Sequence, residues 1–371
     1  MVPLDIPSHH EAAVYDEPGK ISTKLETVET PRPNVGEVLV RLTHSGVCAS
    51  DMAVMTMGWK HLVRPTPKGQ VGGHEGVGVV VALGSDADSP GLEVGQRVGI
   101  KWLASVCGNC EACLSGADSC CTAKKISGYH VPGTFQQYAL APAQYVTPIP
   151  DGLASEQAAP LLCGGLTVYS ALRKSGAHPG DWVVVPGAGG GLGHLCVQIG
   201  RAMGFRMIGI DSGTKKSLVK DECGAEGFVD LGDYNNNDGD DGGAMKMIED
   251  VKLMTGGPGA KAVIVCAASN AAYAQGLRML KFRGTLVCVG VPEGERVPIE
   301  SADPGSIAGR ELRIVGSAVG TRKDAIDVMR LASRGIVKTH VEIFGMEQLT
   351  TVFQKMHAQQ LQGRAVISLE G

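Results

Sequence analysis

Short apolar runs punctuated by glycine dominate the first part of the chain, up to about residue 160. Residues 36–42 and 76–81 are typical, because both are rich in valine and glycine. Runs of this length and composition are typical of β-strands bounded by turns. This part of the chain therefore predicts an irregular domain built mainly from strands.

The pattern changes after Cys163, where strand-like runs alternate with helix-like segments. The six predicted strands cover residues 182–185, 207–210, 227–229, 262–266, 285–289 and 312–315. This alternation is typical of a doubly wound parallel sheet in an α/β domain. A helix predicted at 323–334 leads to strand-like residues ending at 365–368, so we expect the tail to rejoin the first domain. The predicted division is 1–163, 164–320 and 321–371, the last being the C-terminal part of the first domain.

One segment, residues 233–243, interrupts this pattern. It is acidic and poor in apolar side chains, which favours a solvated surface loop. Its alternating carboxylate and amide oxygens also suggest a calcium loop, but the glutamate that such a loop needs at its twelfth position is missing. The surface loop is the preferred interpretation.

Composition and charge narrow the class of partner. The 371 residues include 34 basic and 38 acidic side chains, so no basic excess favours nucleic acid or an anionic membrane. No apolar stretch is long enough to span a bilayer, and the first ten residues lack a basic segment followed by an apolar one. We expect a cytoplasmic protein of two domains that acts on small soluble molecules.

The eleven cysteines are an odd number, and several have metal-ligand spacing, so a disulfide framework is disfavoured. Four others lie within apolar stretches, where a buried and inert thiol is the expected role. These four are Cys196, Cys223, Cys266 and Cys288.

Two separate sets of ligand-type residues indicate two metal sites. Four thiolates within fifteen residues can enclose one tetrahedral zinc ion, and these are Cys107, Cys110, Cys113 and Cys121. A second set, Cys48, His74 and Cys163, comes from three distant segments, so its spacing proves little by itself. Two thiolates and one imidazole on one ion would leave a coordination position open for chemistry. Cys120 is a rival for the fourth position of the first set. A redox-active pair or a nucleic-acid-binding zinc module would also use clustered cysteines, but the crowding of the thiols and the absence of a basic patch weigh against both.

A glycine-rich turn follows the first predicted strand of the α/β domain. Gly187, Gly190, Gly191 and Gly193 precede a helix predicted to run to Met203. Such a turn lets the backbone approach a pyrophosphate at a helix N-terminus, although a glycine run alone is often only a turn. Asp211 ends the next strand, where a carboxylate binds ribose hydroxyls and repels a 2′-phosphate. NAD is therefore preferred over NADP.

Long motifs extend this evidence. The stretches VGGHEG at 71–76, GTFQQYA at 133–139 and GAGGGLG at 187–193 resemble the zinc-dependent medium-chain alcohol dehydrogenases, most closely the yeast and fungal type. The resemblance runs from Pro31 to Arg364. It implies a Rossmann NAD-binding domain at 164–320, a GroES-like catalytic domain formed by 1–163 and 321–371, and a homotetramer.

The resemblance also implies roles for individual residues. Cys48, His74 and Cys163 match the ligands of the catalytic zinc, and Glu75 matches an alternating ligand. Asp51 matches the carboxylate that orients the imidazole. In this family the metal lowers the pKa of the alcohol, an alkoxide passes its hydride to the nicotinamide, and a residue matching Ser50 accepts the proton.

Further matches concern the cofactor and the substrate. Lys216 matches a residue beside the adenosine ribose, although a solvated surface lysine is the plainer reading, and Arg364 matches a pyrophosphate-binding arginine. Trp59 and Trp102 match residues that narrow the substrate pocket, and Val291 replaces a larger methionine. The resemblance therefore implies an NAD-dependent enzyme with two zinc ions that interconverts small to medium primary alcohols and aldehydes. A secondary-alcohol or polyol dehydrogenase, a reductase of a larger aldehyde and a non-enzymatic zinc-binding protein are the alternatives.

Two positions depart from the family pattern. Ala53 stands where a histidine usually passes the proton to water, so ordered water or another group such as His61 would have to replace it. Ala49 stands where a basic side chain usually faces the pyrophosphate. Losing that contact should weaken dinucleotide binding by about 1.5 to 3 kcal/mol.

Overall fold

The structure is a computed structural model that describes residues 6–62, 64–87, 89, 91–234 and 242–370. The chain forms two compact units. The first unit contains Met1–Leu166, Gly320–Gly335 and Thr339–Gly371, and the second contains Thr167–Val319 and Ile336–Lys338.

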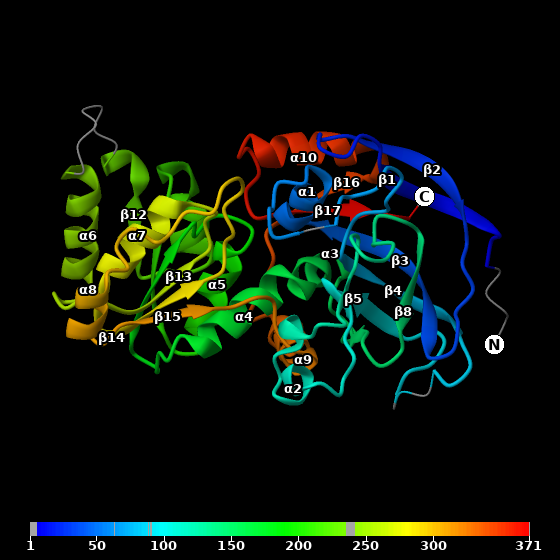
Figure 1. The fold of residues 1–371 in the computed structure, drawn as a ribbon, viewed down its shortest axis with the longest axis horizontal. Helices are drawn as coiled ribbons and strands as arrows, with labels where there is room; N and C mark the ends of the chain where they lie inside the picture. Colours follow the sequence, from blue (N-terminus) through cyan, green and yellow to red (C-terminus); the bar gives the residue numbers. More distant parts are fainter. Residues whose placement is uncertain (1–5, 63, 88, 90, 235–241, 371) are drawn as a thin grey trace. The chain divides into compact units, whose positions relative to one another are not determined.

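A seven-stranded mixed sheet is the centre of the first unit (Figure 1). Its order is β16-β17-β3-β4-β5-β9, with β8 also paired to β3. The bounds are β3 Glu37–Val47, β4 Glu75–Leu83, β5 Arg97–Ile100, β8 Tyr138–Pro142, β9 Thr147–Pro148, β16 Val341–Gly345 and β17 Arg364–Ser368. Because β17 pairs antiparallel with β3, the end of the chain belongs to this unit.

Two small sheets and several short helices complete the first unit. The strands β1 and β2 pair antiparallel, and so do β6 and β7. Their bounds are β1 His9–Tyr15, β2 Thr23–Glu29, β6 Leu103–Ser105 and β7 Lys125–Ile126. The helices are α1 Ala49–Met55, α2 Glu111–Leu114, α3 Ser155–Ala158, α9 Arg322–Ser333 and α10 Leu349–His357. The predicted helix at 323–334 is thus confirmed.

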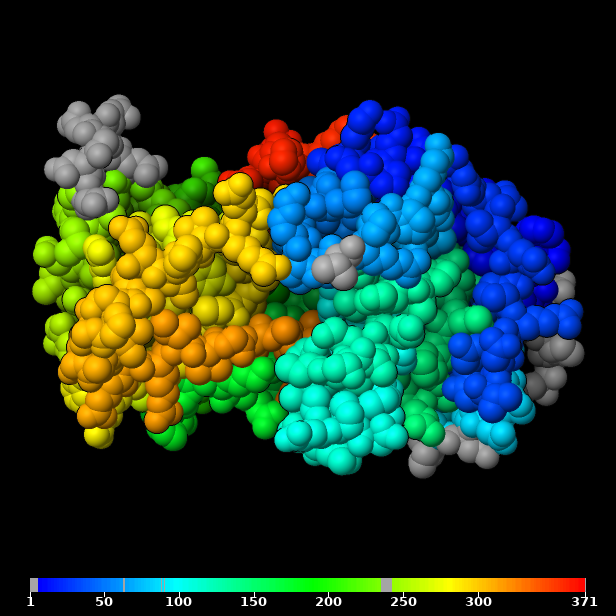
Figure 2. All heavy atoms as spheres, in the orientation of Figure 1, coloured from blue at the N-terminus to red at the C-terminus, as the bar shows by residue number. Residues whose placement is uncertain are grey.

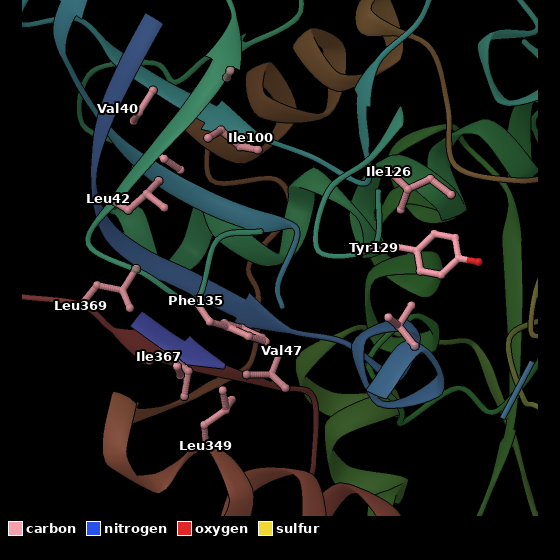
Figure 3. Close-up of a cluster of buried hydrophobic side chains, with 14 of the residues drawn as sticks. Val40, Leu42, Val47, Ile100, Ile126, Tyr129, Phe135, Leu349, Ile367 and Leu369 are labelled. Atoms are coloured by element: carbon pink, nitrogen blue, oxygen red, sulfur yellow. The ribbon is translucent and has the colours of Figure 1, made fainter. Parts of the chain in front are cut away.

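The first unit has its own hydrophobic core (Figure 3). Val40 and Leu42 of β3, Ile100 of β5, and Ile367 of β17 belong to it, and Leu349 of α10 packs with them. Side chains from both ends of the sequence therefore share one buried cluster. This cluster fixes the β3–β4 ladder, and the candidate active site lies at one end of that ladder.

The second unit contains a six-stranded parallel sheet of order β12-β11-β10-β13-β14-β15. This is the doubly wound arrangement that the strand and helix pattern predicted. The strands are β10 Trp182–Pro186, β11 Arg206–Asp211, β12 Gly227–Asp230, β13 Ala260–Val265, β14 Leu280–Cys288 and β15 Arg313–Gly316. All six predicted strands are confirmed, with ends that differ by up to five residues at the start of β14.

Helices α5, α6 and α7 pack against this sheet. The helices are α4 Gly164–Lys174, α5 Gly193–Ala202, α6 Gly242–Met254, α7 Asn270–Arg278 and α8 Pro304–Gly309. Val183, Val184 and Val185 of β10 are fully buried, as expected for a parallel strand that is covered on both faces. The continuous valine run therefore marks the middle of the sheet.

The four thiols expected to be buried divide into two pairs. Cys196 and Cys223 are buried, and burial raises the pKa of both, that of Cys223 to about 12. For Cys266 and Cys288 the expectation was wrong, since both are only partly buried. Cys266 follows β13 and Cys288 ends β14, so these thiols lie where the strands leave the core.

Two other sequence predictions concern the acidic segment and membrane-spanning helices. Most of the acidic segment 233–243 lies outside the described residues, which omit 235–241. Within the residues that are described, no helix combines the length and apolar character needed to cross a membrane.

Candidate active site

Four buried side chains of the first unit bring potential metal ligands together. The ligand atoms of Cys48, His74, Glu75 and Cys163 all lie within 4.8 Å of one another. Cys48 follows β3, and His74 precedes β4, which pairs with β3 in the register Gly46↔Glu75. The ladder thus brings together two segments that are distant in sequence. Cys163 follows directly after the short 3₁₀-helix Ala159–Leu162, which places it beside them.

Asp51 fixes the orientation of the His74 ring. Its Oδ1 lies 2.7 Å from His74 Nδ1, and its Oδ2 accepts the backbone N–H of Cys48 at 2.9 Å. Burial lowers the pKa of His74, but the Asp51 carboxylate outweighs this effect and raises the pKa well above its usual range. A bound cation would replace the proton on Nε2, and the lone pair of Nε2 would then face the cluster, because Nδ1–H is held on the carboxylate. Nε2 is buried and has no hydrogen-bond partner among the described residues. A buried imidazole nitrogen without a partner, next to two thiols, is the arrangement expected of a metal ligand.

The two thiols of this group influence each other. Their hydrogen bond lowers the pKa of Cys48 well below its usual range and raises that of Cys163. One sulfur of the pair therefore ionises readily. A cation that binds both sulfurs would favour the thiolate form of each, because the thiolate is the form that ligates metals.

Glu75 and Arg364 form a buried ion pair within the same unit. Arg364 donates to both carboxylate oxygens of Glu75 and, at 3.0 Å, to the carbonyl of Val47. Burial raises the pKa of Glu75 above its usual range, and the guanidinium limits the rise. Gly46 leaves the room that this carboxylate needs, since a Cβ there would lie 2.0 Å from Glu75 Oε2. The role of Arg364 toward a pyrophosphate stays a prediction.

The expected proton acceptor, Ser50, and the two departures from the family pattern, Ala49 and Ala53, all lie on α1. The Ser50 hydroxyl is half-buried and lies 3.6 Å from the Cys48 sulfur. Ala53 is fully buried, so an imidazole introduced there would have to displace its neighbours. Ala49 is exposed.

The expected substrate-pocket residues fall in both units. Trp102 meets the His74 ring edge-on at 4.8 Å, and Trp59 meets Trp102 edge-on at 6.3 Å. The exposed His61 stacks on Trp59 at 5.2 Å. An aromatic chain thus leads away from the metal-ligand cluster. Val291 belongs to the second unit, and 42% of its surface is exposed.

The second metal-ligand group is formed by Cys107, Cys110, Cys113 and Cys121. Three of its sulfur–sulfur distances are 3.5, 3.6 and 3.9 Å. Four sulfurs bound to one zinc ion at about 2.3 Å would lie about 3.8 Å apart, so the group fits a tetrahedral ion. Of the two rivals for the fourth position, Cys121 is buried in the group and Cys120 is exposed.

This group belongs to a surface loop. Figure 2 shows the segment around α2, in cyan, at the surface, and Leu114 of α2 is 77% exposed. Backbone N–H groups of Asn109 and Cys110 point at the Cys107 sulfur and lower its pKa to about 6. These hydrogen bonds favour a thiolate.

The predicted nucleotide turn lies in the second unit, between β10 and α5. Gly187 has a φ of +80°, and a Cβ on Gly193 would lie 2.0 Å from the carbonyl oxygen of Gly187. Only glycine therefore permits this close turn. Gly190 and Gly191 are partly exposed within it.

Asp211 joins this turn to β11. Its Oδ2 accepts the backbone N–H of Gly189 at 2.8 Å, its Oδ1 accepts that of Ser212 at 2.8 Å, and Lys215 Nζ lies 3.6 Å from Oδ1. Lys216, the lysine singled out from the sequence, is exposed. Lys215 was not expected from the sequence, because Asp211 ends a strand and a spacing of four residues indicates a contact only within a helix.

Comparison with known proteins bears directly on this geometry. A family model described as "Alcohol dehydrogenase GroES-like domain" matches residues 34–151, and one described as "Zinc-binding dehydrogenase" matches residues 191–334. The chain is 53% identical to alcohol dehydrogenase 2 of Emericella nidulans over the full length of both proteins. It is 38% identical to alcohol dehydrogenase of Schizosaccharomyces pombe over 99% of each chain.

Solved structures agree with the fold. The structure of acetophenone reductase from Geotrichum candidum in complex with NAD matches with a TM-score of 0.82 and 27% identity, over 98% of each chain. Alcohol dehydrogenase from Aeropyrum pernix matches with a TM-score of 0.82 and 27% identity, over 96% of this chain and 99% of that one.

Proposed function

This chain belongs to the zinc-dependent medium-chain alcohol dehydrogenase family and is an oxidoreductase that acts on alcohols, and we propose that it interconverts small to medium primary alcohols and aldehydes with NAD. The observation that carries the proposal is the unpartnered Nε2 of His74 beside the sulfurs of Cys48 and Cys163. These three residues would hold a zinc ion, and Glu75 is within reach as a further ligand. A bound zinc ion supplies a Lewis acid that lowers the pKa of an alcohol hydroxyl.

The protein's own side chains would orient the ligands, accept the proton and exclude water. Asp51 holds the His74 ring in the orientation that exposes Nε2. The Ser50 hydroxyl, next to the Cys48 sulfur, would accept the proton of the alcohol. Trp102 would exclude water from one side of the site, because its ring already covers that of His74. A bound NAD would supply the nicotinamide ring as the hydride acceptor.

The glycine turn and Asp211 support NAD as the cofactor. The turn offers the N-terminus of α5 to a pyrophosphate, and the Asp211 carboxylate would repel a 2′-phosphate. The four-cysteine group would hold a second, structural zinc ion, whose four coordination positions would all be filled by sulfur. The cytoplasmic location and the homotetramer expected from the resemblance stay predictions.

A substrate panel tests the proposal. We expect NADH to form, followed by its absorbance, fastest with primary alcohols of two to about four carbons. Primary and secondary alcohols of equal carbon number should be compared, because they differ at the reacting carbon and hardly in size. Faster oxidation of the secondary member of each pair would instead assign the chain to the secondary-alcohol dehydrogenases.

A further inference from the structure

Tyr15 is the last residue of β1, and its hydroxyl lies next to the backbone segments that carry two of the proposed metal ligands, Cys48 and His74. Its side chain is fully buried in the core of the first unit. The hydroxyl donates to the backbone carbonyl of Asp51 at 3.1 Å, and the same oxygen lies against the backbone of Gly72. One oxygen thus connects α1, which begins next to Cys48, with the turn that carries His74.

The backbone around this hydroxyl is shaped to receive it. A Cβ on Gly72 would lie 2.2 Å from the Tyr15 oxygen and 2.4 Å from the ring carbon that bears it. Gly73 has a φ of +91°, where a side chain would be strained. Gly72 therefore leaves the space that the tyrosine fills, and Gly73 allows the turn to pack against Thr134 and Phe135.

The other side of the turn is also held. The carbonyl of Gly73 accepts the backbone N–H of Thr134 at 3.1 Å and the hydroxyl of Ser127 at 3.3 Å, and the carbonyl of Gly72 accepts the N–H of Phe135 at 2.9 Å. These contacts fix the turn against residues 127–135 only. The Tyr15 hydroxyl adds a link between the turn and the backbone of α1, beside the side-chain bond from His74 to Asp51.

Asp51 transmits this restraint to the ligands. Its carboxylate contacts the His74 ring and the backbone of Cys48, while its carbonyl receives the Tyr15 hydroxyl. We infer that Tyr15 is a positioning residue: it holds Asp51 and the 72–74 turn at the separation that aims His74 Nε2 at the metal. This inference rests on the proposed catalytic zinc site.

The variant Tyr15→Phe tests it, because it keeps the ring and removes only the hydroxyl. The matched control is Tyr129→Phe. Tyr129 is 3% exposed in the same core (Figure 3), and its hydroxyl also bridges two backbone groups, accepting the N–H and donating to the carbonyl of Arg64, both at 2.8 Å. Each variant removes the hydrogen bonding of one buried tyrosine hydroxyl to the backbone. Only the Tyr15 hydroxyl bonds to Asp51, beside the metal-ligand cluster.

Zinc release to a coloured chelator is the first measurement. Removing partners of metal ligands typically costs 10- to 100-fold in affinity, and Tyr15 acts one bond further away. We expect Tyr15→Phe to release one of the two zinc ions about tenfold faster, while Tyr129→Phe releases both at the unmodified rate. Equal release from the two variants, or no change in Tyr15→Phe, would overturn the inference.

The visible spectrum of cobalt-substituted protein provides a readout that general destabilisation would not move. With cobalt in the site of Cys48, His74 and Cys163, Tyr15→Phe should shift the ligand-field bands and Tyr129→Phe should not. Should Tyr15→Phe not fold, Gly72→Ala decides the matter, because a Cβ there would lie 2.2 Å from the Tyr15 oxygen and must displace it: the same shift of the cobalt bands supports the inference, and an unchanged spectrum overturns it. If the unmodified protein binds no zinc at this site, the proposed function fails first, and that outcome is visible before any variant is made.

Discussion

At the residue scale, single atoms determine what each candidate site can bind. Nε2 of His74 is the ring nitrogen that is left for a metal, because Asp51 occupies Nδ1. In the second unit, the Asp211 carboxylate likewise makes two contacts, because it accepts the backbone N–H groups of Gly189 and Ser212. Because Asp211 lies at the end of β11, we expect its charge to discriminate between NAD and NADP.

The cofactor preference can be tested with a matched pair of aspartates. Asp211 of β11 and Asp230 of β12 lie opposite each other in the parallel register. We expect Asp211→Ser to lower the ratio of kcat/KM for NADH over NADPH by about tenfold or more, a change of ~1.4 kcal/mol. Asp230→Ser should leave that ratio unchanged. An unmodified enzyme that uses NADPH as well as NADH would refute the role given to Asp211.

At the element scale, the loop that contains α2 is stabilised by few apolar contacts of its own. None of the four residues of α2 is buried, so the helix cannot be fixed by packing alone. The sulfur–sulfur distances fit a tetrahedral zinc ion, and binding such an ion would contribute folding energy directly. The loop should therefore depend on its metal.

Adjacent cysteines allow a direct test of that dependence. Cys121→Ser should remove one zinc equivalent and lower Tm by several degrees, since one kcal/mol corresponds to about 2 to 4 °C in a domain of about 150 to 250 residues. Cys120→Ser, one residue away and exposed, should change neither zinc content nor Tm. If the two variants exchange these results, Cys120 is the fourth ligand and the geometric assignment is incorrect.

At the scale of the whole molecule, much of the architecture could be predicted from the pattern of the chain. The valine run of β10 and the alternation after Cys163 were sufficient for a doubly wound sheet, because parallel strands must be apolar on both faces. The meeting of Cys48, His74 and Cys163 followed from the family resemblance. Their spacing alone could not have shown it, because the β3–β4 ladder brings Cys48 and His74 together and a separate segment, Ala159–Leu162, places Cys163 beside them.

Other features could not be predicted because they depend on three-dimensional neighbours. Nothing in the sequence around Tyr15 indicates that its hydroxyl lies against Gly72, 57 positions later. The pairing of Arg364 with Glu75 likewise requires β17 to lie beside β3. The partial exposure of Cys266 and Cys288 depends on where two strands end, which an apolar pattern locates only approximately.

The central claim is that Cys48, His74 and Cys163 bind a zinc ion on which the activity depends. Elemental analysis of the unmodified protein and of Cys163→Ser, combined with the NADH assay, tests it most directly. Cys223→Ser is the control, because that thiol is buried but lies outside both ligand groups. We predict two zinc equivalents and full activity for the unmodified protein and the control, and one equivalent without activity for Cys163→Ser. Activity retained by Cys163→Ser, or an active unmodified protein with a single zinc equivalent, would contradict the account.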